Sequence, residues 1–142
     1  MELEKSVQDN IDKGVDYLPF GIVVCDVNGL KQVNDVEGHK AGDEYIKVCA
    51  KLLCDIFDHS PVFRIGGDEF VVFLRGEDYN SRKELIERFR TIVRNNRDKE
   101  SGPVIAVGMS EYDPETDDSV TDIFERADYK MYNDKQELKS NV

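Results

Sequence analysis

The stretch Gly66-Gly67-Asp68-Glu69-Phe70 lies between two apolar runs, residues 61–65 and 70–74, and it is the most informative feature of the chain. A Gly-Gly pair between β-branched and aromatic runs predicts a two-residue hairpin turn, in which glycine adopts positive φ without steric cost. Strand alternation from Asp68 onward places Asp68 and Glu69 on opposite faces. Both faces are otherwise apolar, which predicts an interior strand with two carboxylates at its tip.

Two carboxylates at a strand tip fit solvated hairpin residues as well as they fit a cation site. A second segment favours the cation site, because the strand-like residues 20–25 run into Asp26 and then into a polar, glycine-containing loop at 27–43. If the two strands pair antiparallel, Asp26 lies across from Asp68 and Glu69. Clustered carboxylates repel unless they are bridged, and their hard oxygen ligands suit Mg²⁺ bound together with a substrate phosphate.

Composition predicts one folded domain. The chain has 142 residues, of which 39% are hydrophobic and 35% charged, a balance typical of a globular domain. The net charge of −11 disfavours binding to nucleic acid or to an anionic membrane. Three cysteines without Cys-x-x-Cys spacing predict reduced thiols and a cytoplasmic location. No segment has the length and apolarity of a membrane span, and the charged N-terminus is not a signal peptide.

Periodicity predicts an alternation of helices and strands. The predicted helices are 2–17, 41–58, 81–96 (with Ser81 as N-cap) and 120–139; the predicted strands are 20–26, the hairpin 61–74, and 103–109, followed by an acidic loop at 114–119. This order indicates an α/β (α+β) fold with a mostly antiparallel central sheet and helices on both faces.

The chain resembles the GGDEF domain family, the catalytic domains of diguanylate cyclases. Three blocks carry the resemblance in the family's order: Asp26…Lys31…Asn34-Asp35…Gly38-His39…Gly42-Asp43, then Gly66 to Phe70, then Ala127-Asp128…Tyr132…Lys135. The resemblance implies a palm-like nucleotidyl cyclase fold. It also implies a bacterial signalling enzyme that condenses two GTP molecules into cyclic di-GMP and two pyrophosphates. Catalysis would use Mg²⁺ or Mn²⁺ and require two domains face to face in a homodimer.

The resemblance assigns the metal site to three residues and the chemistry to two. Asp26 and Asp68 match the family's metal-binding carboxylates, and Val27 would contribute its backbone carbonyl. Glu69 would support the metal or act as the base, so Asp68 and Glu69 form the catalytic pair. The division of labour between the two acids stays open, since coupled carboxylates share their titration.

The substrate contacts follow from the same match. Asp43 corresponds to the carboxylate that accepts the N1–H and N2 amine of guanine, and Asn34 corresponds to the second base contact. Their structural alternatives are a helix N-cap and a loop Asx-turn. Lys31, Lys135 and Lys139 correspond to phosphate contacts, with Lys139 in place of the family's usual arginine.

Besides Lys139, three further departures from the family pattern shape expectations. Asn28, Gly29 and Leu30 follow the first metal-site Asp where acidic and aromatic residues are more usual. Residues 57–60 read Phe-Asp-His-Ser in place of the Arg-x-x-Asp product-inhibition motif, so no inhibitory site is expected. The head segment that usually precedes the first helix is absent, which predicts that 1–142 is a single GGDEF domain from a longer multidomain signalling protein.

Two functional classes remain at this point: an active diguanylate cyclase, and a degenerate domain that binds GTP or a protein without turnover. A cyclase that makes a monomeric product shares the palm-like architecture, but Asp43 and the hairpin signature argue against it.

Overall fold

A computed structural model describes residues 2–12 and 18–140 of the chain, and within them four strands form one sheet. The elements in chain order are α1 (Glu2–Asp12), β1 (Phe20–Val27), α2 (Leu30–Glu37), α3 (His39–Ile56), β2 (Val62–Arg64), β3 (Glu69–Arg75), α4 (Gly76–Asn80), α5 (Arg82–Lys99), β4 (Ile105–Glu111) and α6 (Val120–Ser140). No helix among these residues is long and apolar enough to cross a membrane.

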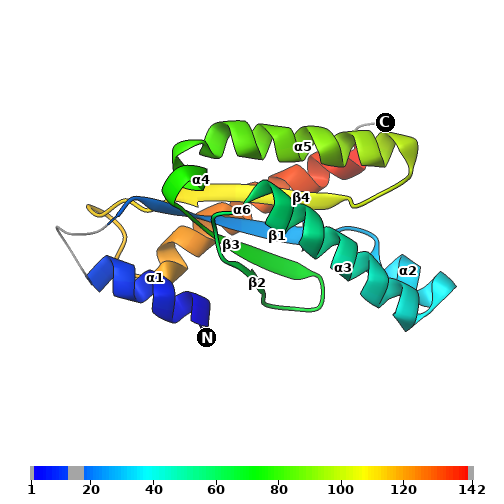
Figure 1. Ribbon diagram of the computed structural model, residues 1–142, viewed down its shortest axis with the longest axis horizontal. Coiled ribbons are helices and arrows are strands. Elements are labelled where there is room, and N and C mark those ends of the chain that lie inside the picture. The colour runs from blue at the N-terminus through cyan, green and yellow to red at the C-terminus, as the bar shows by residue number, and fades with distance from the viewer. Residues whose placement is uncertain (1, 13–17, 141–142) are drawn as a thin grey trace.

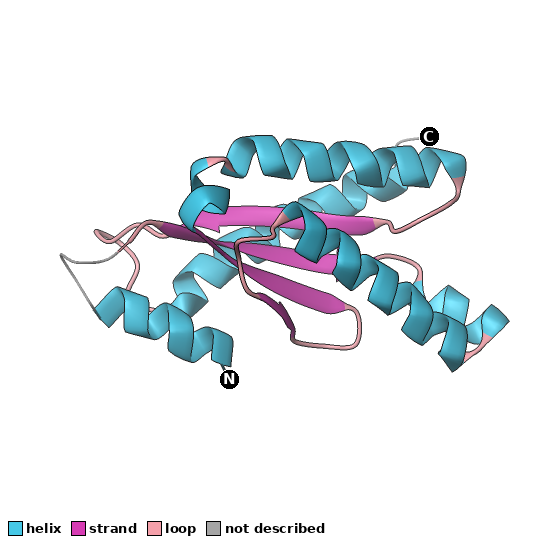
Figure 2. Cartoon of the chain, viewed as in Figure 1, coloured by secondary structure: helices cyan, strands magenta, loops and turns pink. Residues whose placement is uncertain are grey.

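The sheet has the strand order β2-β3-β1-β4, and every neighbouring pair is antiparallel. All eight residues of β1 are buried, as expected for an interior strand covered on both faces. Helices α3 and α5 lie on one face and α6 lies on the other (Figures 1 and 2). The predicted fold class, a mostly antiparallel sheet between helices, is therefore confirmed.

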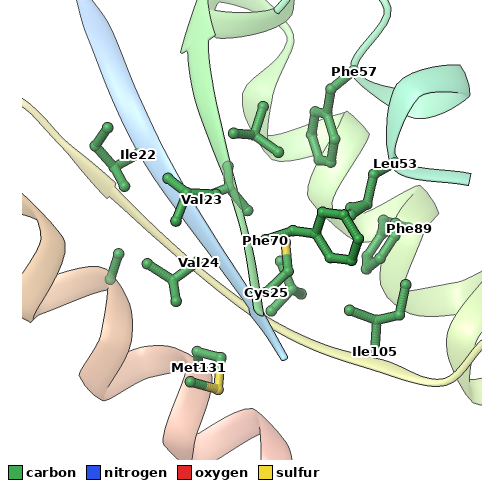
Figure 3. Packing of buried hydrophobic residues seen from close by; sticks show 14 of the residues in the cluster. Ile22, Val23, Val24, Cys25, Leu53, Phe57, Phe70, Phe89, Ile105 and Met131 are labelled. Carbon is green, nitrogen blue, oxygen red and sulfur yellow. The ribbon is translucent and has the colours of Figure 1, made fainter. Parts of the chain in front are cut away.

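Alternation along β1 builds two apolar layers (Figure 3). On one face, Cys25 and Phe70 pack towards Leu53 of α3 and Phe89 of α5. On the other face, Val24 lies towards Met131 of α6. Both layers stop at the same end of the sheet, where β1 and β3 carry carboxylates instead of apolar side chains.

Helix α6 packs directly against the backbone of β4. A Cβ atom at Gly108 would overlap the Met131 nitrogen and the Ala127 carbonyl oxygen, and it would lie 2.8 Å from the Lys130 carbonyl carbon. Only glycine allows this approach.

Side chains of α6 also bond the outer edge of β4. Arg126 donates to the Glu111 carbonyl (2.8 Å), and Lys130 donates to the Met109 carbonyl (3.1 Å). The Val107 N–H donates to the buried carboxylate of Asp134 (2.9 Å). The three side chains are four residues apart, so they form one row along the helix.

Several predicted boundaries were wrong. The polar loop 27–43 is largely helical, because α2 occupies its centre and α3 begins at His39. The strand expected at 103–109 lies two residues later. Ser81 stands at the N-cap position of α5 but its side chain makes no capping hydrogen bond. In the first predicted helix, residues 13–17 lie outside the described residues.

Candidate active site

The ends of β1 and β3 bring Asp26 and Glu69 side by side. These two residues are direct partners in the antiparallel register, so their side chains share one face of the sheet. The Val27 N–H donates to the Asp68 carbonyl (2.7 Å), whereas the reverse bond to the Val27 carbonyl is not formed among the described residues. The predicted meeting of Asp26 with the hairpin acids is confirmed, with Glu69 as its nearest strand partner.

The hairpin connection is longer than a two-residue turn. The strands end at Arg64 and begin again at Glu69, and neither Gly66 nor Gly67 has a positive φ. A side chain at Gly67 would meet nothing within 4 Å. Protein packing therefore does not account for the glycine, and the open backbone leaves room for a ligand to approach.

An arginine that sequence reasoning missed holds this connection. Arg64 donates from Nε to the Gly66 carbonyl (3.2 Å) and from a terminal nitrogen to the Gly67 carbonyl (2.7 Å). Both acceptors are backbone carbonyls, so no sequence motif announces the contact. These bonds fix the path of the chain just before Asp68 and Glu69.

Asp26 is held by a lysine from the far end of the chain. Lys135 on α6 donates to Asp26 Oδ2 at 2.8 Å, while Asp26 Oδ1 is buried and has no hydrogen-bond partner. A buried carboxylate oxygen without a partner is costly, and the cost is removed by a bound cation or donor. The strong electrostatic hydrogen bond to Asp26 raises the pKa of Lys135, so its ammonium stays charged.

Glu69 lies in a field of negative charge. Its pKa is raised, first by burial and then by the neighbouring carboxylates of Asp128, Asp26 and Asp68, while Lys135 acts in the opposite direction. Asp128 was part of the C-terminal motif, but its electrostatic contact with Glu69 could not be read from the sequence. One lysine does not balance four acids, so a divalent cation would relieve the repulsion.

These residues fit a hard cation. Asp26 and Glu69 offer carboxylate oxygens, the unpartnered Oδ1 gives a coordination point, and the Val27 carbonyl accepts no bond from the Asp68 N–H. Oxygen donors of this kind suit Mg²⁺ or Mn²⁺. The carboxylates of Asp26, Asp68 and Glu69 do not all gather within 4.8 Å of one another in the described structure.

A separate group of metal-compatible side chains lies where the segment before β2 meets α4. Ligand atoms of Asp58, His59 and Asp78 lie within 4.8 Å of one another. The buried Asp78 carboxylate accepts bonds from the His59 N–H (2.9 Å) and from Ser60 Oγ (2.7 Å). These bonds tie α4 to the segment that enters the hairpin, which gives Asp78 a structural role.

Helices α2 and α3 carry the predicted nucleotide contacts. Asn34 lies in α2, with its side chain directly over Gly42 of α3, where a Cβ atom would overlap its amide oxygen. Asp43 is exposed and is the fifth residue of α3, so the N-cap alternative is wrong. Asn34 is helical rather than in a loop, so the Asx-turn alternative is wrong too. Glycine at 42 thus leaves room for the Asn34 side chain against α3, next in sequence to Asp43.

The predicted phosphate lysines come from two helices. Lys31 is exposed in the first turn of α2. Lys139 is exposed near the end of α6, one turn beyond the half-buried Lys135, so both project from one side of that helix. Of the three, Lys135 is the one that already contacts the carboxylate cluster.

Sequence comparison finds relatives of this chain among the diguanylate cyclases. Diguanylate cyclase A of Treponema denticola is 30% identical over 128 residues, which are 87% of this chain and 34% of that protein. The diguanylate cyclase DgcP of Pseudomonas aeruginosa is 30% identical over 139 residues, or 94% of this chain and 20% of that protein. The chain therefore spans about a third or less of the length of these curated relatives.

Solved structures show the same fold. The active GGEEF domain of a diguanylate cyclase from Vibrio cholerae superposes with a TM-score of 0.79 at 24% identity, covering 95% of this chain and 88% of that one. The GGDEF domain of DgcB from Caulobacter crescentus, solved in complex with c-di-GMP, gives 0.74 at 24% identity, covering 95% and 81%. The family described as "Diguanylate cyclase, GGDEF domain" matches residues 2–141. Since that match runs through almost the whole sequence, the chain belongs to the GGDEF domain family.

Proposed function

We propose that this chain is a diguanylate cyclase domain that joins two GTP molecules into cyclic di-GMP and releases two pyrophosphates. The observation that carries the proposal is the unpartnered, buried Oδ1 of Asp26, beside Glu69 and Lys135 at the strand ends. Such an oxygen needs a cation or donor to offset its burial. The names of the curated relatives support the same reaction.

We propose that Asp26, Glu69 or Asp68, and the Val27 carbonyl would hold Mg²⁺ or Mn²⁺. When bound, the metal would neutralise triphosphate charge and polarise the α-phosphorus. Lys135 contacts Asp26 directly, so metal entry would free its ammonium to bind a phosphate oxygen. Lys31 and Lys139 would add charge along the triphosphate, where a lysine acts as a point charge.

Each transfer forms a bond between a ribose 3′-oxygen and the α-phosphorus of the other GTP. The bond from that phosphorus to the bridging oxygen of pyrophosphate breaks, and pyrophosphate leaves with the electron pair. The hydroxyl proton passes to a carboxylate. Glu69 suits this role because burial and neighbouring acids raise its pKa, which makes it a better proton acceptor than an ordinary glutamate.

Asp43 and Asn34 would select the base. A carboxylate accepts both the N1–H and the N2 amine of guanine, and adenine does not present this donor pair. One domain binds one GTP in this scheme, so two copies must face each other. We propose that residues 1–142 serve as one catalytic half within a longer cytoplasmic signalling protein.

The test is incubation of concentrated protein with GTP and Mg²⁺, with products separated by chromatography. Wild type is expected to form cyclic di-GMP, whereas Asp26→Ala and Asp68→Ala should form none. The matched control is Asp55→Ala, which removes an exposed carboxylate on α3 that pairs with Lys51.

The other candidate is a GTP-binding module without turnover. It would be supported if wild type, even when two copies are joined through a fused coiled coil, makes no product but binds GTP in a manner lost in Asp43→Ala. Absence of both turnover and GTP binding would reject the nucleotide site altogether.

A further inference from the structure

The last pair of residues between β1 and β4 is held open by a tyrosine hydroxyl. The β1–β4 register pairs Val27 with Ile105, so Asn28 and Val104 are the next partners. The Asn28 N–H donates directly to the Val104 carbonyl at 2.8 Å. In a regular antiparallel pair, the Val104 N–H would return a bond to the Asn28 carbonyl.

Here the return bond passes through Tyr45 of α3. The Val104 N–H donates to Tyr45 Oη (3.2 Å), and Tyr45 Oη donates to the Asn28 carbonyl (3.0 Å). A hydroxyl can accept one bond and donate another, so it can bridge an N–H and a carbonyl that do not bond each other directly. Burial raises the pKa of Tyr45, so the phenol keeps the proton that it donates.

The opened pair lies where the predicted active site begins. Asn28 follows Val27, whose carbonyl is a candidate metal ligand, and precedes Gly29, which stands at the N-cap of α2 with φ 78°. Tyr45 is two residues beyond Asp43, the candidate guanine contact on the same helix. Its hydroxyl therefore connects the base-reading helix with the end of the metal-binding strand.

We propose that Tyr45 is a positioning residue, which sets the Val27 carbonyl and the following loop in the geometry that binds the catalytic cation. The hydroxyl keeps the Asn28 carbonyl from bonding the Val104 N–H directly, so β1 turns towards α2 at a defined point. This inference rests on the proposed function, because it concerns the metal of that same site.

Tyr45→Phe tests the role with the least disturbance, because the ring stays and the hydroxyl alone is lost. Without it, Val104 can bond Asn28 directly and draw the loop towards β4. Loss of an outer partner of a metal site typically lowers metal affinity or activity about 10- to 100-fold. We expect about tenfold weaker Mn²⁺ binding, measured by electron paramagnetic resonance with 3′-deoxy-GTP, which cannot react.

The steady-state constants separate positioning from a general structural effect. With Mg²⁺ varied, Tyr45→Phe should need about tenfold more metal for half-maximal cyclic di-GMP synthesis and have a lower kcat. At saturating Mg²⁺, the KM for GTP should stay within about twofold of wild type, because the phosphate and base contacts are intact. Tyr129→Phe, which changes an exposed tyrosine of α6, is the matched control. It should leave the Mg²⁺ requirement, kcat and the KM for GTP unchanged.

Each outcome decides the inference. Unchanged Mn²⁺ affinity and kcat in Tyr45→Phe would overturn it while leaving the proposed function in place. If wild type makes no cyclic di-GMP but binds Mn²⁺ with 3′-deoxy-GTP, weaker Mn²⁺ binding by the variant supports the positioning role. In that case only the proposed catalytic activity is rejected. If wild type binds neither, both ideas are rejected.

A second measurement covers the case in which Tyr45→Phe does not fold. In wild type, Mn²⁺ with 3′-deoxy-GTP should slow amide hydrogen exchange at Asn28 and Val104, because the ligand and Tyr45 hold the same loop. The exchange rate of the Val93 amide, in α5 and buried in the core, should not change. Unchanged exchange at Asn28 and Val104 in the ligand-bound protein would contradict the inference.

Discussion

Replacing Gly108 by alanine should separate α6 from the sheet and damage the active site from a distance. The added methyl would lie 2.8 Å from the Lys130 carbonyl carbon and still closer to backbone atoms of Met131 and Ala127, whereas ordinary contacts are 3.4–4 Å. The first contact alone requires a retreat of about 0.6 Å, and the closer ones require about 1 Å. All three atoms are helix backbone, so no side chain can move aside.

The cost follows from the rigidity of these atoms. Overpacking a core typically costs about 1–3 kcal/mol, and contact with three backbone atoms of α6 places Gly108→Ala at about 3 kcal/mol. For a domain of this size that loss lowers Tm by roughly 10 °C. Helix α6 also carries Lys135, which bonds Asp26 at 2.8 Å, so a shift of about 1 Å should reduce turnover about 100-fold.

Thermal unfolding followed by circular dichroism, together with the cyclic di-GMP assay, measures both effects. Gly67→Ala is the control for stability, because its methyl meets nothing within 4 Å and its φ is not positive. A Gly108→Ala protein that melts within ~2 °C of wild type would refute the close approach of α6 to β4, and the account of the site built on it.

Three further predictions concern other contacts. Lys135→Met should abolish product formation, and Mg²⁺ should raise the free energy of unfolding of this variant more than that of wild type, because Asp26 loses the Lys135 ammonium that pairs with it. The measurement is the change in melting temperature on adding Mg²⁺. An equal change in both proteins would contradict the prediction. The bonds from Arg126 lower the pKa of Asp117, so their stabilisation is present above the ordinary carboxyl value of 3.8 and is lost as pH falls through the lowered pKa. Urea unfolding should therefore show the largest gap between wild type and Asp117→Asn near neutral pH and a closing gap in acid, and a constant gap would argue against the pair. Gly42→Ala should gain helix propensity yet raise the KM for GTP about tenfold by displacing the asparagine that overlies it, and an unchanged KM would exclude that asparagine from the base site.

Much of the scaffold followed from local patterns. The buried strand at Phe20–Val27 was predicted to within one residue, because a continuous apolar run that ends at a carboxylate has few other interpretations. Helix α6 was predicted from the helical spacing of its apolar residues, and the pairing of Asp26 with the hairpin acids was predicted from antiparallel pairing of the two apolar strands. The helix α2 was missed because its residues, Leu30–Glu37, are mostly polar, lie between two glycines, and none is buried.

The acidic residues of the candidate site could be predicted from the sequence, but the side chains that hold the nearby backbone in place could not. Asp26 and Glu69 are visible as charges that interrupt apolar strands, and the family motifs supplied Asp43 and the lysines. The bonds from Arg64 to two carbonyls and from Tyr45 to the Asn28 carbonyl join side chains to backbone. The Tyr45 bond depends on how α3 meets the end of β1, and the Arg64 bonds depend on the path of a connection only a few residues long, so residue type and spacing encode neither. The positive φ expected at the hairpin glycines was wrong because the connection has four residues instead of two.

The row of α6 side chains along β4 governs how this protein can meet other chains. An exposed strand edge is a template on which another strand can add, and so a route to aggregation. Outward-facing backbone groups of β4 are already bonded to Arg126, Lys130 and Asp134, so that edge has few groups left to pair with an incoming strand. The opposite edge, β2, has only three residues. If two copies meet as the proposed function requires, they are thus guided away from continuous-sheet assembly, and a reversible encounter between the carboxylate ends of the sheets is favoured over a permanent fusion.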